Sequence, residues 1–428
     1  MARIWFGLGY WLFVVLGSLD IAAQETPPAQ ETPPPVQETP PATPEVTGQT
    51  PSPELKVPDD VRLAMEDLND ALGSGSGRRI GQKFSMDAMF ESLLERKLIP
   101  PLDEAEQAEI RTRLGAAMRS KYRSFAELAW TNVKWIRFER LDEQRVVLLG
   151  RHYDKDELST SVRWWLKLEE DQWVVYDLEI LDLNLRFSTM AGAGFAIGAK
   201  QPESLGAFQE LTSMAEILNT GILDEEGLEN IVDNADLVLG DEYPADIKRF
   251  VLLLRALALA QLDDAPGALA DLATLEKMPG ESPILYRVRG EILAEREQYA
   301  AAIESFKKLG EALGYDVSVH ESLADTFLAW GKFDQAAVHA RLGLQDMPES
   351  SGCLASLAAA LPSSKVAELE PFFKDHDYDE NVLATVIMWC TELDRMAGAK
   401  FAYQALKKHH PNSDLIEEWR EDLDSNDD

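Results

Sequence analysis

Three segments of the chain align without a gap at a spacing of 34 residues: ALALAQLDDAPGALADL at 256–272, GEILAEREQYAAAIESF at 290–306 and ADTFLAWGKFDQAAVHA at 324–340. A small residue begins each segment (Ala256, Gly290 and Ala324), and another follows twelve positions later (Ala268, Ala302 and Ala336). Small side chains at both positions let two helices approach closely while larger neighbours fill the core. The pattern therefore predicts stacked helix–turn–helix units.

Larger residues keep the same phase at Leu259, Leu293 and Phe327. A further equivalent position has Leu272, Phe306 and, in the third segment, the small Ala340. With Pro348 closing the third unit and with Tyr299 and Phe333 opening second helices, this region resembles the tetratricopeptide repeat family. It departs from the family at Leu252, Tyr286 and His320, where strong members have Trp, and at Ala265. The resemblance implies an α-helical solenoid over residues 204–424, with about five or six helix pairs.

A tetratricopeptide-like solenoid implies a concave face that binds extended peptides or partner helices. We expect the six small residues named above to lie at helix–helix contacts. The candidates for binding a protein or peptide partner are polar residues of the first helices: Arg255, Arg287, Arg289 and Glu321. Each of them is also the kind of residue that solvent simply hydrates. An acidic tail at 425–428 ends the chain and is expected to be solvated.

The N-terminal residues 1–23 have the pattern of an export signal, with Arg3 before an apolar run from Ile4 to Leu19 and small residues at Ala22 and Ala23. The alternative is an uncleaved membrane anchor through residues 4–19, although a span needs about 20 apolar residues. Residues 24–58 contain eleven of the chain's 22 prolines and no aromatic residue, which predicts a disordered, extended linker. The sequence thus favours a periplasmic or extracellular protein, in contact with a membrane only if the signal is retained.

Residues 59–200 are expected to form an α+β domain. Apolar periodicity predicts helices at 61–72, 85–94 and 103–118, with Ser85 as an N-cap. It then changes to a period of two and predicts four strands, at 130–140, 145–153, 158–168 and 172–181. Short polar connections make these strands an antiparallel, curled sheet, with a tight hairpin at 169–171. The fold class is therefore multidomain, an α+β domain followed by the solenoid.

The run from Trp173 to Ile180, followed by Leu185, Arg186 and Phe187, resembles the last strand of the periplasmic phospholipid-carrier family. The resemblance covers residues 133–187 and implies the cone-shaped α+β fold shared with ketosteroid isomerases. If the cone is hollow, it implies a lipid or small hydrophobic ligand inside, with the pocket lined by Trp135, Trp164, Tyr176 and Phe187. Aromatic residues at strand period are more often simply core.

Candidates for catalysis are few. His152, Asp154 and Asp156 form the only His/carboxylate cluster, and their position at a strand end indicates a solvated turn. Asp177 and Glu179 should face outward, opposite Val174, Tyr176 and Leu178. The Gly-rich run 190–198 predicts an interdomain hinge or a small-residue helix packed against a neighbour. We therefore expect no catalytic residues, no metal and no cofactor.

Composition limits the function further. The chain has 75 acidic and 41 basic residues and a net charge of −34, which argues against nucleic-acid binding. Cys353 and Cys390 are expected to be either one disulfide or two buried thiols. The leading hypothesis is an exported, non-enzymatic scaffold that binds a protein partner through the array. The alternatives are a carrier of a lipid or small hydrophobic ligand, and an enzyme, both in the α+β domain.

Overall fold

The computed structural model describes residues 55–99, 103–121, 129–153, 159–181, 185–192, 206, 210–211, 224–240, 243 and 245–424. The expected signal at 1–23, almost all of the linker, the acidic tail and, apart from positions 206, 210 and 211, residues 193–223 lie outside these residues. The chain divides into two compact units, Met1–Leu285 and Tyr286–Asp428.

The first unit begins with helices α2 (Asp59–Gly73), α3 (Gly77–Gly81), α4 (Met86–Glu95) and α5 (Glu104–Lys121). Ser85 is the N-cap of α4, as expected, because its hydroxyl accepts a hydrogen bond from the Ala88 N–H. In α2, the residues that recur on one helical face are buried, namely Val61, Met65, Leu68 and Leu72.

An antiparallel meander follows, built from β1 (Asn132–Arg140), β2 (Arg145–Tyr153), β3 (Ser159–Glu169) and β4 (Gln172–Ile180). These are the four predicted strands, and a two-residue strand, β5 (Leu185–Arg186), extends the sheet at the β4 edge. The β3–β4 hairpin is tight because Glu170 and Asp171 both have positive φ, the conformation that matches the twist of the strands.

A β-bulge changes which residues of β4 share a face. Trp165 pairs with Asp177 and Leu166 pairs with Val175, so Tyr176 is an extra residue in β4. Consequently Val175 and Leu178 both point into the large core, while Tyr176 packs with Trp165 on the other face. Strict alternation along β4 predicted the opposite placement for Tyr176.

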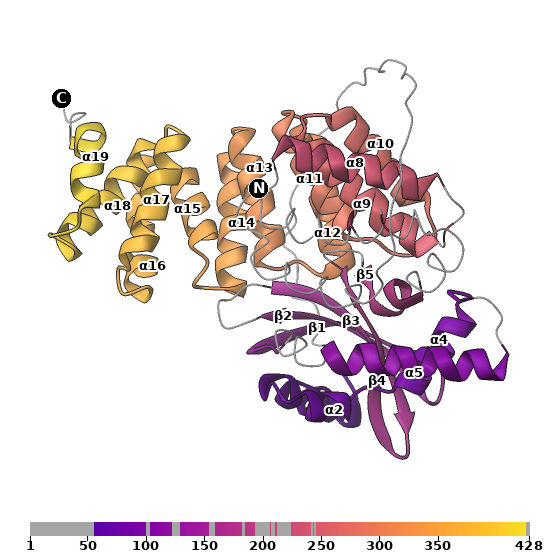
Figure 1. Ribbon diagram of the computed structural model, residues 1–428. Coiled ribbons are helices and arrows are strands. Elements are labelled where there is room, and N and C mark those ends of the chain that lie inside the picture. The colour runs from indigo at the N-terminus through magenta and orange to yellow at the C-terminus, as the bar shows by residue number, and fades with distance from the viewer. Residues whose placement is uncertain are drawn as a thin grey trace. The chain divides into compact units, whose positions relative to one another are not determined.

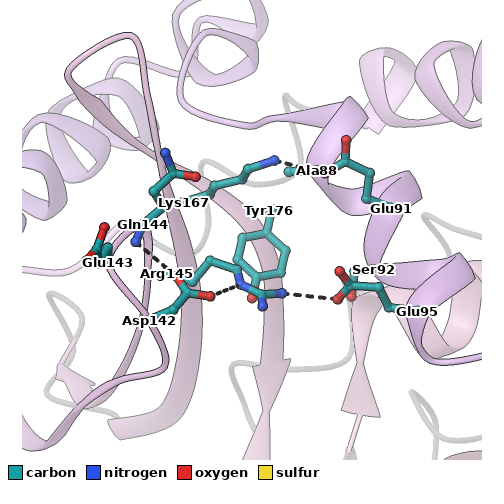
Figure 2. A pocket seen from close by; sticks show the side chains of 10 residues that line it. All are labelled: Ala88, Glu91, Ser92, Glu95, Asp142, Glu143, Gln144, Arg145, Lys167 and Tyr176. Atoms are coloured by element: carbon teal, nitrogen blue, oxygen red, sulfur yellow. Dashed lines mark hydrogen bonds and ion pairs between the residues drawn. The ribbon is translucent and has the colours of Figure 1, made fainter.

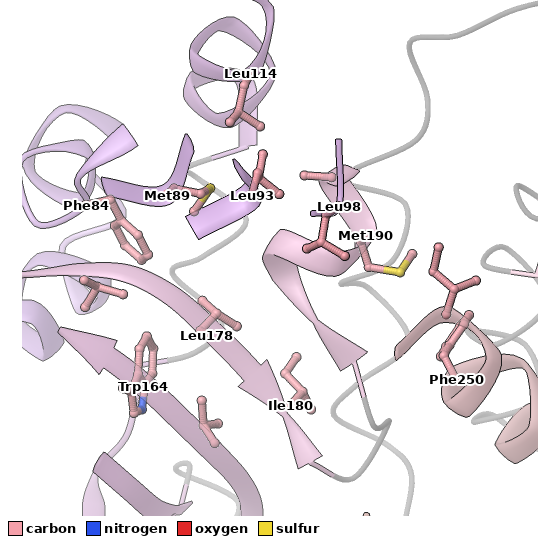
Figure 3. Packing of buried hydrophobic residues seen from close by; sticks show 14 of the residues in the cluster. Phe84, Met89, Leu93, Leu98, Leu114, Trp164, Leu178, Ile180, Met190 and Phe250 are labelled. Carbon is pink, nitrogen blue, oxygen red and sulfur yellow. The ribbon is translucent and has the colours of Figure 1, made fainter. Parts of the chain in front are cut away.

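One hydrophobic core runs from the sheet into the first helices of the array. It contains residues of α2, α4 and β2–β4 together with α8 (Glu225–Leu239) and α9 (Ala245–Gln261). Figure 3 shows Ile180 of β4, Met190 and Phe250 of α9 following one another in this core. The two compact units therefore divide within the array, after Leu285. The sequence predicts the end of the α+β domain at residue 200.

The array continues with α10 (Ala265–Lys277), α11 (Ile284–Glu295), α12 (Tyr299–Leu313), α13 (Val317–Ala329) and α14 (Phe333–Asp346). It ends with α15 (Ser351–Ala360), a 3₁₀ helix (Ser363–Leu369), α16 (Glu370–Asp375), α17 (Glu380–Glu392), α18 (Met396–His409) and α19 (Leu415–Asp424). In the second unit, α13 packs on α14, α14 on α15 and α17 on α18 (Figure 1). This succession of helix pairs is the expected tetratricopeptide-like solenoid.

The turns between paired helices also repeat. A residue with positive φ ends the first helix of four pairs: Asp263, Glu297, Gly331 and Asp394. The next N–H donates back to a carbonyl of that helix at 2.7–2.8 Å, as Gln298 does to Leu293 and Lys332 to Phe327. This is the C-cap geometry that favours glycine, yet glycine is present in only one of the four turns. Among the described helices, none is both long enough and apolar enough to cross a bilayer.

Candidate functional site

The first helices of two consecutive pairs place charged side chains at equivalent positions. Arg287 and Glu291 lie on α11, and Glu321 and Asp325 lie 34 residues later on α13. Arg287 is buried, and the three carboxylates are partly buried. We refer to Glu291, Glu321 and Asp325 as the acidic row. Of these four residues, sequence reasoning identified only Arg287 and Glu321 as candidates.

Burial disturbs the ionisation of this row. It raises the pKa of Asp325 to about 7, partly opposed by the Ser356 hydroxyl, which donates to Asp325 Oδ1 at 2.5 Å, and reinforced by Glu321. Burial likewise raises the pKa of Glu291, against the effect of Arg287. Because a buried carboxylate is costly without a compensating cation, the acidic row favours a cationic group beside it.

The remaining candidate arginines are placed differently. Arg255 of α9 is held by both oxygens of Asp271 of α10, at 2.7 and 2.8 Å, and by Asp236 of α8. It therefore ties three helices of the first unit together, a structural use for a residue considered for partner binding. Arg289 is partly buried on α11.

All six small residues of the 34-residue pattern are buried. Gly290 shows why the position is small: a Cβ there would lie 2.6 Å from the Phe306 ring. In the third unit, Ala324 takes the place of Gly290 and Ala340 takes the place of Phe306. The first position is therefore larger than in the second unit, and the second position is smaller. The two positions compensate for each other in volume.

Buried histidines and thiols occupy helix contacts of the second unit. His320 Nδ1 and His339 Nδ1 lie 3.2 Å apart, and Phe327 stacks on His339. Burial, reinforced by His320, lowers the pKa of His339 to about 4. Cys353 and Cys390 are separate buried thiols, not a disulfide, and burial raises the pKa of each to about 12.

The four aromatic residues expected around a cone do not share one surface. Trp164 is fully buried in the large core, where Trp135 and Phe187 pack against it as partly buried residues. Tyr176 lies on the other face of the sheet with Trp165, because of the bulge in β4.

His152 does not lie in a solvated turn, as its sequence neighbours suggested. It is 5% exposed and contacts the rings of Trp130, Trp135 and Trp164. Trp164 Nε1 donates a hydrogen bond to His152 Nε2 at 3.0 Å, and burial lowers the pKa of His152 to about 3. The imidazole is therefore neutral at pH 7 and part of the core. Asp154 and Asp156 lie outside the described residues.

The side chains of Asp177 and Glu179 do not face solvent either. Asp177 is fully buried and bonds to Arg186 at 2.5 Å, to Arg96 at 3.5 Å and to Ser188. Glu179 is 5% exposed, and burial raises its pKa although it pairs with Arg163 at 3.0 Å. Both side chains face a second layer of residues that covers this side of the sheet. The prediction that they face outward is therefore wrong.

The array contributes two acidic residues to that layer. Asp246 of α9 pairs with Arg96 and accepts a hydrogen bond from Thr189 at 3.0 Å. Glu281, just before α11, pairs with Arg163 at 2.6 Å and with Arg137 at 2.9 Å. We call these groups, with Asp177 and Glu179, the ionic layer. Together with the core it fixes the start of the array to the sheet.

The Gly-rich run after the sheet is partly described. Residues 187–192 form a helical turn, and a Cβ on Gly192 would lie 2.6 Å from Leu98 Cβ. For Met190, Ala191 and Gly192, packing against a neighbour is therefore correct and a hinge is wrong. Residues 193–198 lie outside the described part of the chain.

Comparison with solved structures adds a similarity to a helical repeat protein. No protein-family model matches the chain, and no curated protein matches it. Among solved structures, it is similar to a tetratricopeptide repeat protein from Parabacteroides merdae ATCC 43184, at 17% identity and a TM-score of 0.37. The similarity covers 56% of this chain and 92% of that chain. The assignment of the array to a tetratricopeptide-like solenoid rests on the helix pairs described above.

Proposed function

We propose that the chain is a protein-interaction scaffold whose helical array binds an extended segment of a partner, without catalysis. The observation that carries the proposal is the acidic row, in which Glu291 of α11 and Asp325 of α13 are partly buried carboxylates at equivalent positions, with Glu321 beside Asp325. A partner segment that presents Lys or Arg beside Glu291 and Asp325 offsets the cost of burying these two charges.

The test is cross-linking of the purified chain with an envelope fraction, followed by mass spectrometry of the captured proteins. The informative variant is Glu291→Gln/Asp325→Asn, which removes two charges and little volume. Its matched control is Glu304→Gln with Glu311→Gln, because these two glutamates are exposed on α12. We expect the first variant to lose the captured partner and the control to keep it. Capture by neither variant, or equally by both, contradicts a role for the acidic row.

We also propose that residues 1–23 export the protein and that residues 24–58 act as a linker, a proposal supported by their sequence alone. The mass of the protein purified from its native cells tests it. A chain that begins near Gln24 indicates cleavage, an intact start in the membrane fraction indicates an anchor, and an intact start in the cytosol contradicts export.

No observation favours the two alternatives in the α+β part. Trp164 is fully buried and Tyr176 faces away from it, which gives a lipid carrier no shared lining. His152, the candidate for an enzyme, is enclosed by three tryptophans.

A further inference from the structure

A pocket of about 440 Å³ lies between α4 and the sheet, beside the turn that joins β1 to β2. Helix α4 contributes Ser92 and Glu95, the turn contributes Asp142 and Glu143, and β4 contributes Tyr176. Figure 2 shows Tyr176 in the middle of the lining residues, between α4 and the side chains of the sheet. The pocket is distinct from the acidic row, which belongs to the second unit.

Two hydroxyl groups open into this pocket. Tyr176 is 5% exposed and Ser92 is 6% exposed, and within the described residues neither hydroxyl forms a hydrogen bond. Both hydroxyls are therefore available to a molecule that occupies the pocket. A space of this size holds far more than one bridging water, whose share of liquid volume is about 30 Å³.

Charges in the lining indicate the sign of that partner. Arg145 and Lys167 are directly opposite each other on β2 and β3, and carboxylates hold both of them. Arg145 pairs with Asp142 at 2.7 Å and Glu95 at 3.1 Å, and Lys167 pairs with Glu91 at 2.8 Å.

Glu143 adds an exposed carboxylate for which no ion pair is formed within the described chain. The lining therefore has four carboxylates and two cations, both already paired. An anion entering this pocket is repelled, and a cation is attracted.

We propose that this pocket binds a small organic ammonium ion, such as a diamine or an amino alcohol. Its N–H groups donate to the hydroxyl oxygens of Ser92 and Tyr176, and the surplus carboxylates, Glu143 among them, balance its charge. This inference goes beyond the proposed scaffold function and does not depend on it.

Isothermal titration of the full chain with putrescine, glucose and phosphate at low ionic strength tests the proposal. We expect putrescine to bind at one site per chain, and glucose and phosphate not to bind. Tyr176→Phe with Ser92→Ala removes the two hydroxyls and should weaken putrescine binding about tenfold, the effect of two lost hydrogen bonds. Unchanged far-UV circular dichroism shows that this variant still folds.

Charge is tested by a matched pair of variants. Glu143→Gln should weaken putrescine binding, and Glu139→Gln, an equal change at an exposed residue that does not line the pocket, should not. The proposal is overturned if putrescine shows no saturable binding, if Glu143→Gln and Glu139→Gln behave alike, or if glucose binds and putrescine does not. Weak binding of many putrescine molecules per chain also overturns it, because that is the behaviour of an acidic surface.

Discussion

At the scale of single residues, the helix contacts of the array depend on volume. Gly290→Ala places a methyl group 2.6 Å from the Phe306 ring, which is itself buried. We expect a loss of about 1–3 kcal/mol in the free energy of unfolding, because overpacking forces side chains from their rotamers. Urea denaturation measures it. Adding Phe306→Leu should restore part of the loss, and Ala300→Ser, at an exposed site on α12, should change little.

Asp325 makes stability depend on pH in a defined direction. Its folded pKa of about 7 exceeds the ordinary value of 3.8 for an aspartate, so the folded state holds a proton that the unfolded state releases. The ionised carboxylate therefore lowers stability above pH 7, and its effect fades as the pH falls toward 4. We expect Asp325→Asn to stabilise the protein at pH 8 by on the order of 1 kcal/mol.

Unfolding at pH 8 and pH 5 measures this difference. An equal effect of Asp325→Asn at both values of pH contradicts a raised pKa. Asp334→Asn provides the control, since Asp334 is exposed at the start of α14.

At the scale of elements, the sequence predicts the strands and most helices because each has a clear apolar period. What it does not predict is the bulge in β4, since no residue near Tyr176 distinguishes a bulged strand from a regular one. The extra residue places Tyr176 on the opposite face of the sheet from the one predicted. The pocket that Tyr176 lines could therefore not be predicted from the sequence. The outward placement of Asp177 and Glu179 failed for another reason, because the ionic layer that covers them comes from distant parts of the chain.

The turns of the array were hard to detect because three of four lack glycine. Glu297 has φ of 60°, a conformation in which a side chain is unfavourable. We expect Glu297→Gly to stabilise the array by up to about 1 kcal/mol and Gly331→Ala to destabilise it by a similar amount. Thermal unfolding of both variants measures these opposite effects. A loss of stability in Glu297→Gly contradicts the proposed turn conformation.

At the scale of the whole molecule, the core and the ionic layer determine where the chain can be cut. A fragment of residues 59–200 loses Phe250 and Asp246 and leaves their apolar and charged partners in water. We expect this fragment to bind the dye ANS and to melt without a cooperative transition, whereas residues 59–285 should unfold cooperatively. Cooperative melting of the shorter fragment contradicts the continuous core.

The ionic layer has a further consequence for synthesis of the chain. Ile180 is made about 70 residues before Phe250, and at about 5–20 residues per second the sheet waits several seconds for α9. During that delay the surface that α9 and Glu281 will cover presents Asp177, Glu179 and Arg163 to water, beside the apolar side chains that later pack on Phe250. Hydrated charges on that face resist pairing with other nascent chains. The same charges that join the folded parts thus protect the half-made protein from aggregation.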